Sequence, residues 1–164
     1  MSSMLVTGGA GFVGSHLVEH LLAAGHEVTV IDNFAIGHEN NLAHLRGNPK
    51  LTVVRGDILD FELMKKHCEH KDVVFHLAAF TRIQPSIANP RLAVEVNCAG
   101  TTAVLQACKQ AGVKRVVYAG SSSAYGDQNT TQVLADGKAL SEDMGTDCRS
   151  PYALSKKFGE DMMG

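Results

Sequence analysis

The sequence lacks the features that mark membrane-bound, secreted or nucleic-acid-binding proteins. Its formal net charge is −2 over 164 residues, so no basic surface for nucleic acid or an anionic membrane is indicated. No apolar run is long enough to cross a bilayer. The first residues, MSSMLVTGGAG, show neither the basic nor the apolar segment of a signal peptide. We therefore expect a cytoplasmic protein with no membrane partner and no nucleic-acid partner.

The cysteines and histidines give little support for disulfides or a metal site. No CxxC pair occurs among Cys68, Cys98, Cys108 and Cys148, which favours reduced thiols. His16 and His20 are one helical turn apart, and HCEH at 67–70 groups two more histidines with a cysteine. No further ligand at suitable spacing completes either set. The sequence therefore predicts no metal.

Short apolar segments alternate with segments of helical periodicity along the whole chain. Strands are expected at 3–7, 27–32, 51–57, 72–79 and 113–120, and helices at 12–25, around 42–45, at 61–70, at 91–110 and from about 150 onwards. A polar loop is expected at 128–147. This order predicts an α/β fold with a doubly wound parallel sheet of Rossmann type. The length suits one domain, residues 1–164.

A glycine-rich loop joins the first strand to the first helix. The segment TGGAGFVG places Gly8, Gly11 and Gly14 in a GxxGxxG spacing. In this position the glycines permit a tight turn, close approach of a pyrophosphate and close packing of helix on strand. The free amides at the start of the helix, with the positive end of its dipole, then bind the phosphates.

Two aspartates follow the next two strands. Asp32 closes the second strand, where a carboxylate accepts hydrogen bonds from the adenosine ribose and repels a 2′-phosphate, so NAD is favoured over NADP. Asp57 ends the third strand beside the expected adenine position, although aspartate after glycine is also common in turns.

Seven motifs in order resemble the extended short-chain dehydrogenase/reductase family, in its nucleotide-sugar epimerase and dehydratase branch. They are TGGAGFVGSHL, DN after the second strand, RGDILD, FHLAA, VNCAGT, SSSAYG and SPYALSKKFGE. The resemblance covers nearly the whole chain and is strongest to the UDP-glucose 4-epimerase type. It implies Ser121, Tyr152 and Lys156 as catalytic residues. It also implies a cofactor site for NAD at Gly8, Gly11, Phe12, Val13, Gly14, Asp32, Asn33, Asp57, Ile58, Ala78, Ala79, Asn97, Tyr152 and Lys156.

Elementary chemistry supports the tyrosine and lysine roles. Tyr152 and Lys156 lie one turn apart on the expected last helix, so they share a face. A tyrosine pKa of about 10 must fall to about 7 to give phenolate at neutral pH, which requires about 4 kcal/mol. A nearby ammonium and an oxidised nicotinamide are suitable sources of that stabilisation. The phenolate could then take a proton from a sugar hydroxyl.

The segment SSSAYG bears on the choice of reaction within the branch. The resemblance implies acidic residues just after the Ser121 position in dehydratases, and a glutamate at the Ser123 position in decarboxylases. Here Ser122 and Ser123 are both hydroxyl residues, which favours epimerisation of a UDP-hexose through a transient ketone. A dehydratase, a decarboxylase and a non-catalytic NAD-binding module remain the alternatives. Gly120 stands where relatives carry serine or alanine, and the loop at 128–147 is longer than theirs.

The resemblance also implies further sheet strands and a small sugar-binding domain after the last helix, and a homodimer. We therefore expect residues 1–164 to be an N-terminal portion with an open sheet edge after the fifth strand, holding NAD weakly and nearly inactive alone. The expected dimer uses the helices after the fourth and fifth strands. Their apolar residues are Val94, Val104, Leu105, Leu154 and Phe158.

Overall fold

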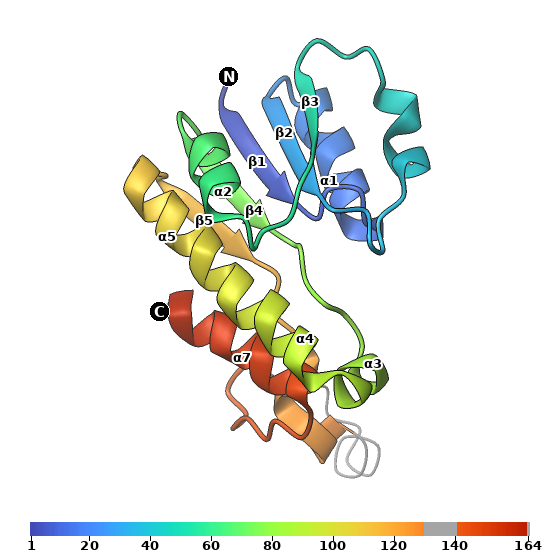
Figure 1. Cartoon of the computed structure of the whole chain (residues 1–164), viewed down its shortest axis with the longest axis vertical. Helices are drawn as coiled ribbons and strands as arrows, with labels where there is room; N and C mark the ends of the chain where they lie inside the picture. The colour runs from blue at the N-terminus through green and yellow to red at the C-terminus, as the bar shows by residue number, and fades with distance from the viewer. Residues whose placement is uncertain (130–140, 164) are drawn as a thin grey trace. The chain divides into compact units, whose positions relative to one another are not determined.

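The structure is a computed structural model that describes residues 1–129 and 141–163 (Figure 1). The chain divides into two compact units. Unit 1 comprises Met1–Ala79 and Ala99–Ala119, and unit 2 comprises Phe80–Cys98 and Gly120–Gly164. The expectation of one domain over residues 1–164 stays a prediction.

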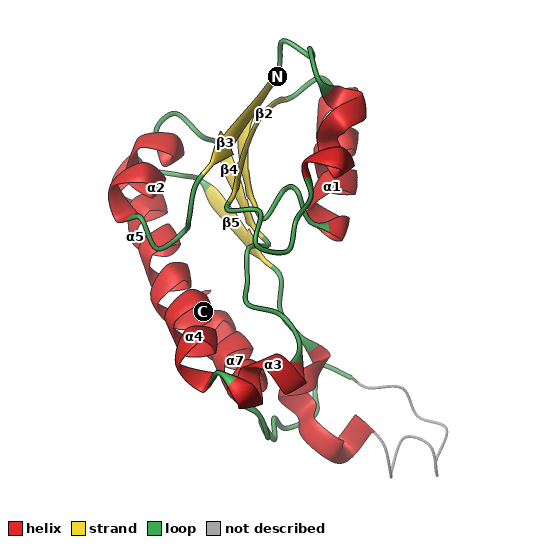
Figure 2. Ribbon diagram, turned by 45° about the vertical axis from the view of Figure 1, so that its right-hand side comes forward, coloured by secondary structure: helices red, strands yellow, loops and turns green. Residues whose placement is uncertain are grey.

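Unit 1 is a parallel sheet with helices on both faces. Its strands are β1 (Ser3–Thr7), β2 (Glu27–Asp32), β3 (Leu51–Arg55), β4 (Val73–His76) and β5 (Arg115–Tyr118), in the order β3-β2-β1-β4-β5. Helix α1 (Phe12–Ala23) covers one face, and α2 (Phe61–Cys68) and α5 (Thr101–Ala111) cover the other (Figure 2). A 3₁₀ helix, η1 (Glu39–Leu45), joins β2 to β3. The doubly wound parallel sheet predicted from the sequence is confirmed.

β-Branched residues of the central strands form the core of unit 1. Val6, Val28 and Val30 are almost completely buried and pack with Val18 and Leu22 of α1. Helix α1 ends at Ala23, and Gly25 follows with φ of 87°, a left-handed conformation that favours glycine. The apolar periodicity and the glycine stop therefore produce the helix that the sequence predicts.

Strand β4 is shorter than predicted, because it ends at His76 and not at Ala79. The His76 side chain is buried between two hydroxyl groups. Its Nδ1 lies 2.7 Å from Oγ1 of Thr7 on β1, and its Nε2 lies 3.0 Å from Oγ1 of Thr101 on α5. This chain of hydrogen bonds ties two strands to a helix in the adjacent layer.

Unit 2 contains mainly helices. They are α3 (Ile83–Ala88), α4 (Pro90–Val94), η3 (Ser122–Asn129) and α7 (Pro151–Met163). A π-helical turn, η2 (Glu95–Gly100), joins α4 to α5 of unit 1. The predicted helical run at 91–110 and the helix from about 150 are confirmed, whereas α3 and the π turn were not predicted. The sequence pattern did not predict α3 because this segment contains Pro85, and proline is unfavourable within helices.

The predicted loop at 128–147 is only partly described. Gln128 and Asn129 belong to η3, residues 130–140 lie outside the described residues, and 141–147 contain no helix or strand. Asp147 is anchored, since its amide donates to the carbonyl of Ala124 at 2.8 Å.

Both ends of the described sheet are edge strands. Strands β3 and β5 each pair with a single neighbour, and Val117 of β5 is 40% exposed. The edge expected to stay open after the fifth strand remains a prediction. Within residues 1–129 and 141–163, no helix is long and apolar enough to cross a membrane.

The cysteines of the structure are free thiols, and two of them are in contact. The Sγ atoms of Cys68 on α2 and Cys108 on α5 lie 3.8 Å apart, and both residues are buried. Among the described residues, no group of three or more His, Cys, Asp and Glu side chains is arranged to hold a metal ion.

Candidate functional site

The glycine loop of unit 1 is a close-packed turn between β1 and α1. Gly8 has φ of 72°, and a Cβ there would lie 2.7 Å from the amide nitrogen of Ala78. A Cβ on Gly14 would lie 2.3 Å from the carbonyl oxygen of Gly8. Any larger residue at either position would therefore move the backbone, which explains the spacing that the sequence shows.

The start of helix α1 leaves backbone donors available. Gly11 is the N-cap residue, and no side chain caps the helix. The amides of Phe12, Val13 and Gly14 have no acceptor within the helix, because the first turn never does. The side chains of Phe12 and Val13 are 78% and 65% exposed. These amides form the anion-binding feature that a diphosphate requires.

Asp32 fixes the loop from the end of β2. The residue is only 7% exposed. Its Oδ2 accepts from the amide of Ala10 at 2.9 Å, and its Oδ1 accepts from the amide of Phe34 at 2.8 Å. Each carboxylate oxygen can accept a further hydrogen bond. Asp32 can therefore both shape the loop and bind a ribose hydroxyl.

The other predicted cofactor residues of unit 1 surround the same sheet edge. Asn33 donates from Nδ2 to Oδ2 of Asp57 at 2.8 Å, which joins the loops after β2 and β3. Ile58 is buried, and its Cδ1 fills the space beside Gly100. Ala78 donates its amide to Oγ1 of Thr7 at 3.3 Å, and the following Ala79 is half-buried. The structure thus brings these residues together at the carboxyl ends of β1, β2, β3 and β4.

This edge fits the cofactor that the sequence predicts. The loop carries glycine at positions 8, 11 and 14, the helix start has amides without an intrahelical acceptor, and Asp32 provides a carboxylate after β2. These are the groups by which a Rossmann fold holds a dinucleotide. The residues of unit 1 therefore match the adenosine diphosphate half of NAD.

Asn97 belongs to unit 2, where its side chain makes hydrogen bonds to two other segments of that unit. Its Oδ1 accepts from the amide of Phe80 at 2.7 Å, and its Nδ2 donates to the Phe80 carbonyl at 3.0 Å and to Oγ of Ser155 at 2.9 Å. Both amide hydrogens are thereby used. Asn97 fixes the segment after β4 against α7, and its predicted contact with the cofactor stays a prediction.

Helix α7 presents the Tyr152 and Lys156 pair. Ser150 caps the helix by accepting from the amide of Ala153 at 3.1 Å, and Pro151 occupies the first helical position. The Tyr152 amide donates to Oγ of Ser86 on α3 at 3.1 Å. The predicted YxxxK pair therefore lies in the first turns of a capped helix.

Lys156 is almost completely buried, at 4% exposure. Burial lowers the pKa of its ammonium from 10.5 to about 8, and the Glu160 carboxylate partly offsets this by raising it. An ammonium with a pKa of about 8 still carries its charge at neutral pH.

Ser121 is held by another hydroxyl group. Its Oγ lies 2.8 Å from Oγ of Ser123 and accepts from the Ser123 amide at 3.3 Å. Ser123 occupies the position at which the family resemblance expects a glutamate in decarboxylases. The side chain at position 123 therefore contacts the predicted catalytic hydroxyl directly, and in this chain it is neutral.

Glu160 connects Ser121 to α7 and was not predicted from the sequence. Its Oε1 accepts from the amide of Ser121 at 3.4 Å and lies 2.5 Å from the place where a Cβ on Gly120 would stand. The same carboxylate raises the pKa of Lys156 one turn away. Two features of the sequence could have indicated this role of Glu160: the unusual glycine at position 120, and the spacing of four residues between Lys156 and Glu160.

Comparison with known proteins places this chemistry in a family. The sequence matches the NAD dependent epimerase/dehydratase family over residues 4–163. It is 39% identical over 158 residues to a UDP-glucose 4-epimerase of Mycolicibacterium smegmatis, covering 95% of this chain and 48% of that protein. It is 41% identical over 122 residues to a UDP-N-acetyl-alpha-D-glucosaminuronate decarboxylase of Bacillus cytotoxicus, covering 74% and 37% of the respective chains.

A solved structure gives the same result. The UDP-glucose 4-epimerase of Thermus thermophilus, in complex with NAD, has a TM-score of 0.84 and 36% identity, covering 98% of this chain and 49% of that chain. The chain thus spans about half the length of these epimerases. The family resemblance, and NAD as the cofactor of the family, are confirmed. The reaction within the family is not decided by these relatives, because they differ in activity.

The contact between Gly120 and Glu160 can be tested by a double-mutant cycle. Gly120→Ala should push the Glu160 carboxylate away, weaken its bond to the Ser121 amide and destabilise the chain by about 1 kcal/mol. In a Glu160→Ala background the same change should cost almost nothing, because the carboxylate is gone. Urea unfolding of the four proteins measures the coupling. Gly145→Ala, at a glycine with open space around it, is the control, and equal costs in both backgrounds would refute the contact.

The burial of Lys156 predicts a pH-dependent stability. Between pH 8 and pH 10.5 the folded chain has lost the Lys156 proton while the unfolded chain retains it, so stability rises with pH in this window. Lys156→Met should remove this rise, stabilising the chain at pH 7 by up to about 3 kcal/mol and hardly at all at pH 10.5. Urea midpoints across this range measure the difference, with exposed Lys109→Met as the control. Parallel curves for native and Lys156→Met chains would contradict the assignment.

Proposed function

The chain belongs to the NAD-dependent epimerase/dehydratase family, and we propose that it is the NAD-binding part of a nucleotide-sugar epimerase acting at C4 of a UDP-hexose. The observation that carries the proposal is the composition of unit 2. A tyrosine and a buried lysine share α7, and the Ser121 hydroxyl is paired with the neutral Ser123. The family, and the curated epimerase that shares 39% identity, support the same interpretation.

The residues of this chain would transfer the proton and orient the sugar. Tyr152 takes the proton from the C4 hydroxyl as general base, and Ser121 donates a hydrogen bond to the same oxygen. The buried ammonium of Lys156 stabilises the Tyr152 phenolate, since a charge interaction is stronger away from water. NAD, held at the carboxyl edge of the unit 1 sheet, would supply the acceptor and donor of hydride for C4.

Unit 1 would bind the adenosine diphosphate half of NAD. The amides of Phe12, Val13 and Gly14 face the diphosphate, and Asp32 accepts a hydrogen bond from the ribose. Asp57 and Ile58 lie beyond β3, where the adenine would rest. Each of these roles follows from the fit of the sheet edge to a dinucleotide.

A decarboxylase or a dehydratase is the competing enzyme. The relative from Bacillus cytotoxicus, at 41% identity, favours the decarboxylase on sequence alone. Ser122 and Ser123 argue against both, because the family resemblance implies acidic residues just after the Ser121 position in dehydratases and a glutamate at the Ser123 position in decarboxylases. A non-catalytic NAD-binding module is the remaining alternative.

Tyr152→Phe is the test of the proposed mechanism. The variant keeps the ring and removes the phenolic oxygen, so we expect at least a roughly thousandfold loss of turnover while NAD binding persists. The assay uses the longest polypeptide that the reading frame through Gly164 encodes. NMR analysis of products from UDP-glucose, UDP-glucuronate and dTDP-glucose separates epimerase, decarboxylase and dehydratase.

The conservative control is Tyr125→Phe in η3, which should retain turnover. Near-native turnover of Tyr152→Phe would overturn the assignment of the base. A protein that binds NAD but shows no sugar-dependent change in the nicotinamide spectrum would identify the non-catalytic module instead.

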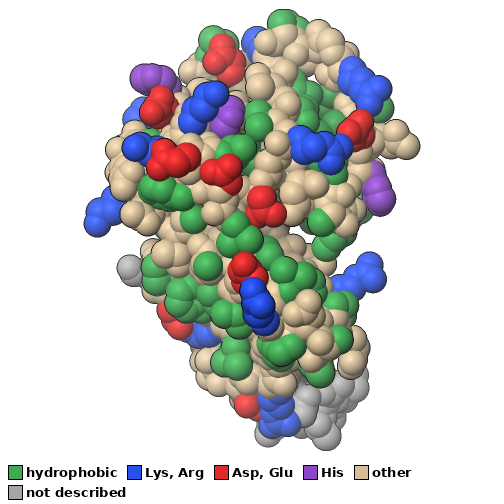
Figure 3. Space-filling model, viewed as in Figure 1, with side chains coloured by type: hydrophobic (Ala, Val, Ile, Leu, Met, Phe, Trp, Pro, Cys, Tyr) green, Lys and Arg blue, Asp and Glu red, His purple; other side chains and the backbone are tan. Residues whose placement is uncertain are grey.

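The proposed assembly is a homodimer, as the family resemblance implies. In unit 2, Val94 of α4 and Leu154 and Phe158 of α7 are 50%, 60% and 38% exposed, and hydrophobic side chains gather over this region in Figure 3. Val104 of α5 is fully buried, so its inclusion in the predicted interface was wrong: it is a core residue. Exposed apolar side chains that recur on two adjoining helices suit a partner surface.

Leu154→Glu should convert this dimer to a monomer, because it places a charge in an apolar contact. Light scattering at micromolar concentration measures the mass of each protein. Ile36→Glu, at a similarly exposed residue of unit 1, should leave the dimer intact. A monomeric native chain would contradict the proposed assembly.

A further inference from the structure

An arginine stands beside the carboxylate that is proposed to bind the ribose. Asp32 and Arg55 are register partners on the adjacent parallel strands β2 and β3. Asp32 disfavours a 2′-phosphate, whereas an arginine near this position favours one, since NADP enzymes of this fold use arginine for that purpose. The chain therefore carries two opposite signals for the same cofactor group.

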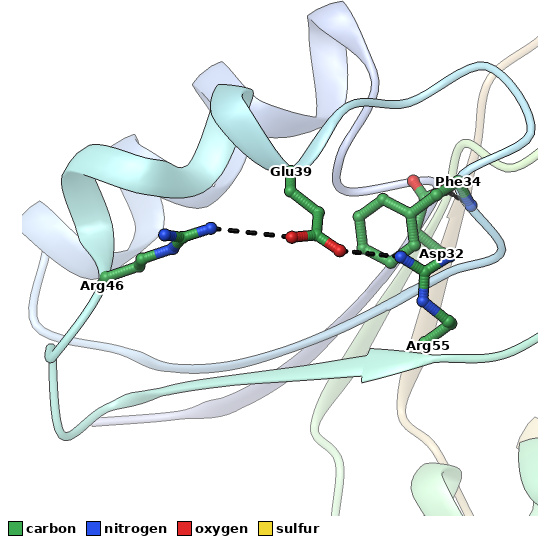
Figure 4. Close-up of polar contacts among 5 residues, drawn as sticks. All are labelled: Asp32, Phe34, Glu39, Arg46 and Arg55. Carbon is green, nitrogen blue, oxygen red and sulfur yellow. Dashed lines mark hydrogen bonds and ion pairs between the residues drawn. The ribbon is translucent and has the colours of Figure 1, made fainter.

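The guanidinium of Arg55 is already engaged by two neighbours. Its Nη2 donates to Oε1 of Glu39 at 2.7 Å, and its Cζ lies 4.3 Å from the centroid of the Phe34 ring (Figure 4). Phe34 adopts a φ of 59°, and Asp32 holds its amide. The charge of Arg55 is thereby neutralised on one side and covered by a ring on the other.

Glu39 binds a second arginine as well. Its Oε2 lies 3.6 Å from Nη2 of Arg46, at the end of η1, so one carboxylate bridges two cations (Figure 4). All three side chains are more than half exposed, and they line a hollow of about 400 Å³ between η1 and β3. Because the pair is exposed, little free energy holds Arg55 in place, and the hollow leaves room for it to rotate.

We propose that Glu39 is a specificity-determining residue that acts through Arg55: by pairing with the guanidinium it withholds Arg55 from a ribose 2′-phosphate and so reinforces the selection of NAD by Asp32. This rests on the proposed cofactor site of unit 1. Glu39 itself need not touch the cofactor, which makes it a positioning residue. Its effect is on the ratio of the NADP and NAD affinities, and a purely structural role would change both affinities together.

The test is the ratio of dissociation constants for NADP and NAD, measured by calorimetry on this chain. The native chain should prefer NAD, and Glu39→Gln should reduce that preference about fivefold, the size expected for releasing one exposed ion pair. Glu39→Gln in an Arg55→Met background should leave the ratio unchanged. Glu62→Gln, at an exposed carboxylate in the first turn of α2, controls for the loss of one negative charge.

Several outcomes would overturn the proposal. These are equal changes in the NAD and NADP affinities of Glu39→Gln, a change of ratio that persists without Arg55, and a similar change in Glu62→Gln. Asp32→Gly separates the proposal from the cofactor assignment, since it should lower the NAD preference whatever Glu39 does. A native chain that binds neither cofactor, or prefers NADP, would refute the cofactor assignment and this proposal together.

Discussion

The close approach of Gly14 to the carbonyl of Gly8 is the constraint on which the rest of unit 1 depends. A Cβ on Gly14 would lie 2.3 Å from that oxygen, so only glycine lets helix α1 begin directly above β1. Asp32 then ties the loop to the neighbouring strand through the amide of Ala10. The first-turn amides are left without intrahelical acceptors at the sheet edge as a result. The glycine pattern is thus a packing requirement first, and phosphate binding uses the donors that the packing leaves free.

Much of this was predictable because it depends on local pattern. Runs such as EVTVI and the glycine stop at position 25 specify β2 and the end of α1 with little help from elsewhere, and the order of strands and helices then implies the parallel sheet. The glycine loop, Asp32 and the YxxxK pair could be placed for the same reason, since each lies at a fixed offset from a strand or a helix start.

The parts that escaped prediction depend on contacts between distant segments. Asn97 was predicted from a motif of the family, but its hydrogen bonds to Phe80 and Ser155, 17 and 58 residues away, could not be foreseen. Glu160 reaches back to Ser121 across 39 residues, and Arg55 pairs with Glu39 across 16. A sequence read in short windows shows each of these side chains as an ordinary polar residue. Their roles appear only when the chain is folded.

Glu39 and Glu160, which were found only in the structure, have opposite effects on the basic residues beside them. In the proposal above, Glu39 competes with a ribose 2′-phosphate for the guanidinium of Arg55. It does so through an ion pair at the surface, which solvent weakens. Glu160 helps Lys156 to keep its charge. Burial lowers the pKa of the Lys156 ammonium, and the Glu160 carboxylate opposes this effect, so that the pKa is about 8. At neutral pH the ammonium therefore remains mostly protonated although it is buried. A charge that is both retained and shielded from water interacts more strongly with its neighbours than a solvated one. The proposed role of Tyr152 as a base requires this combination. An exposed lysine would stabilise a phenolate only weakly, and a buried lysine without Glu160 would be closer to losing its charge near neutral pH.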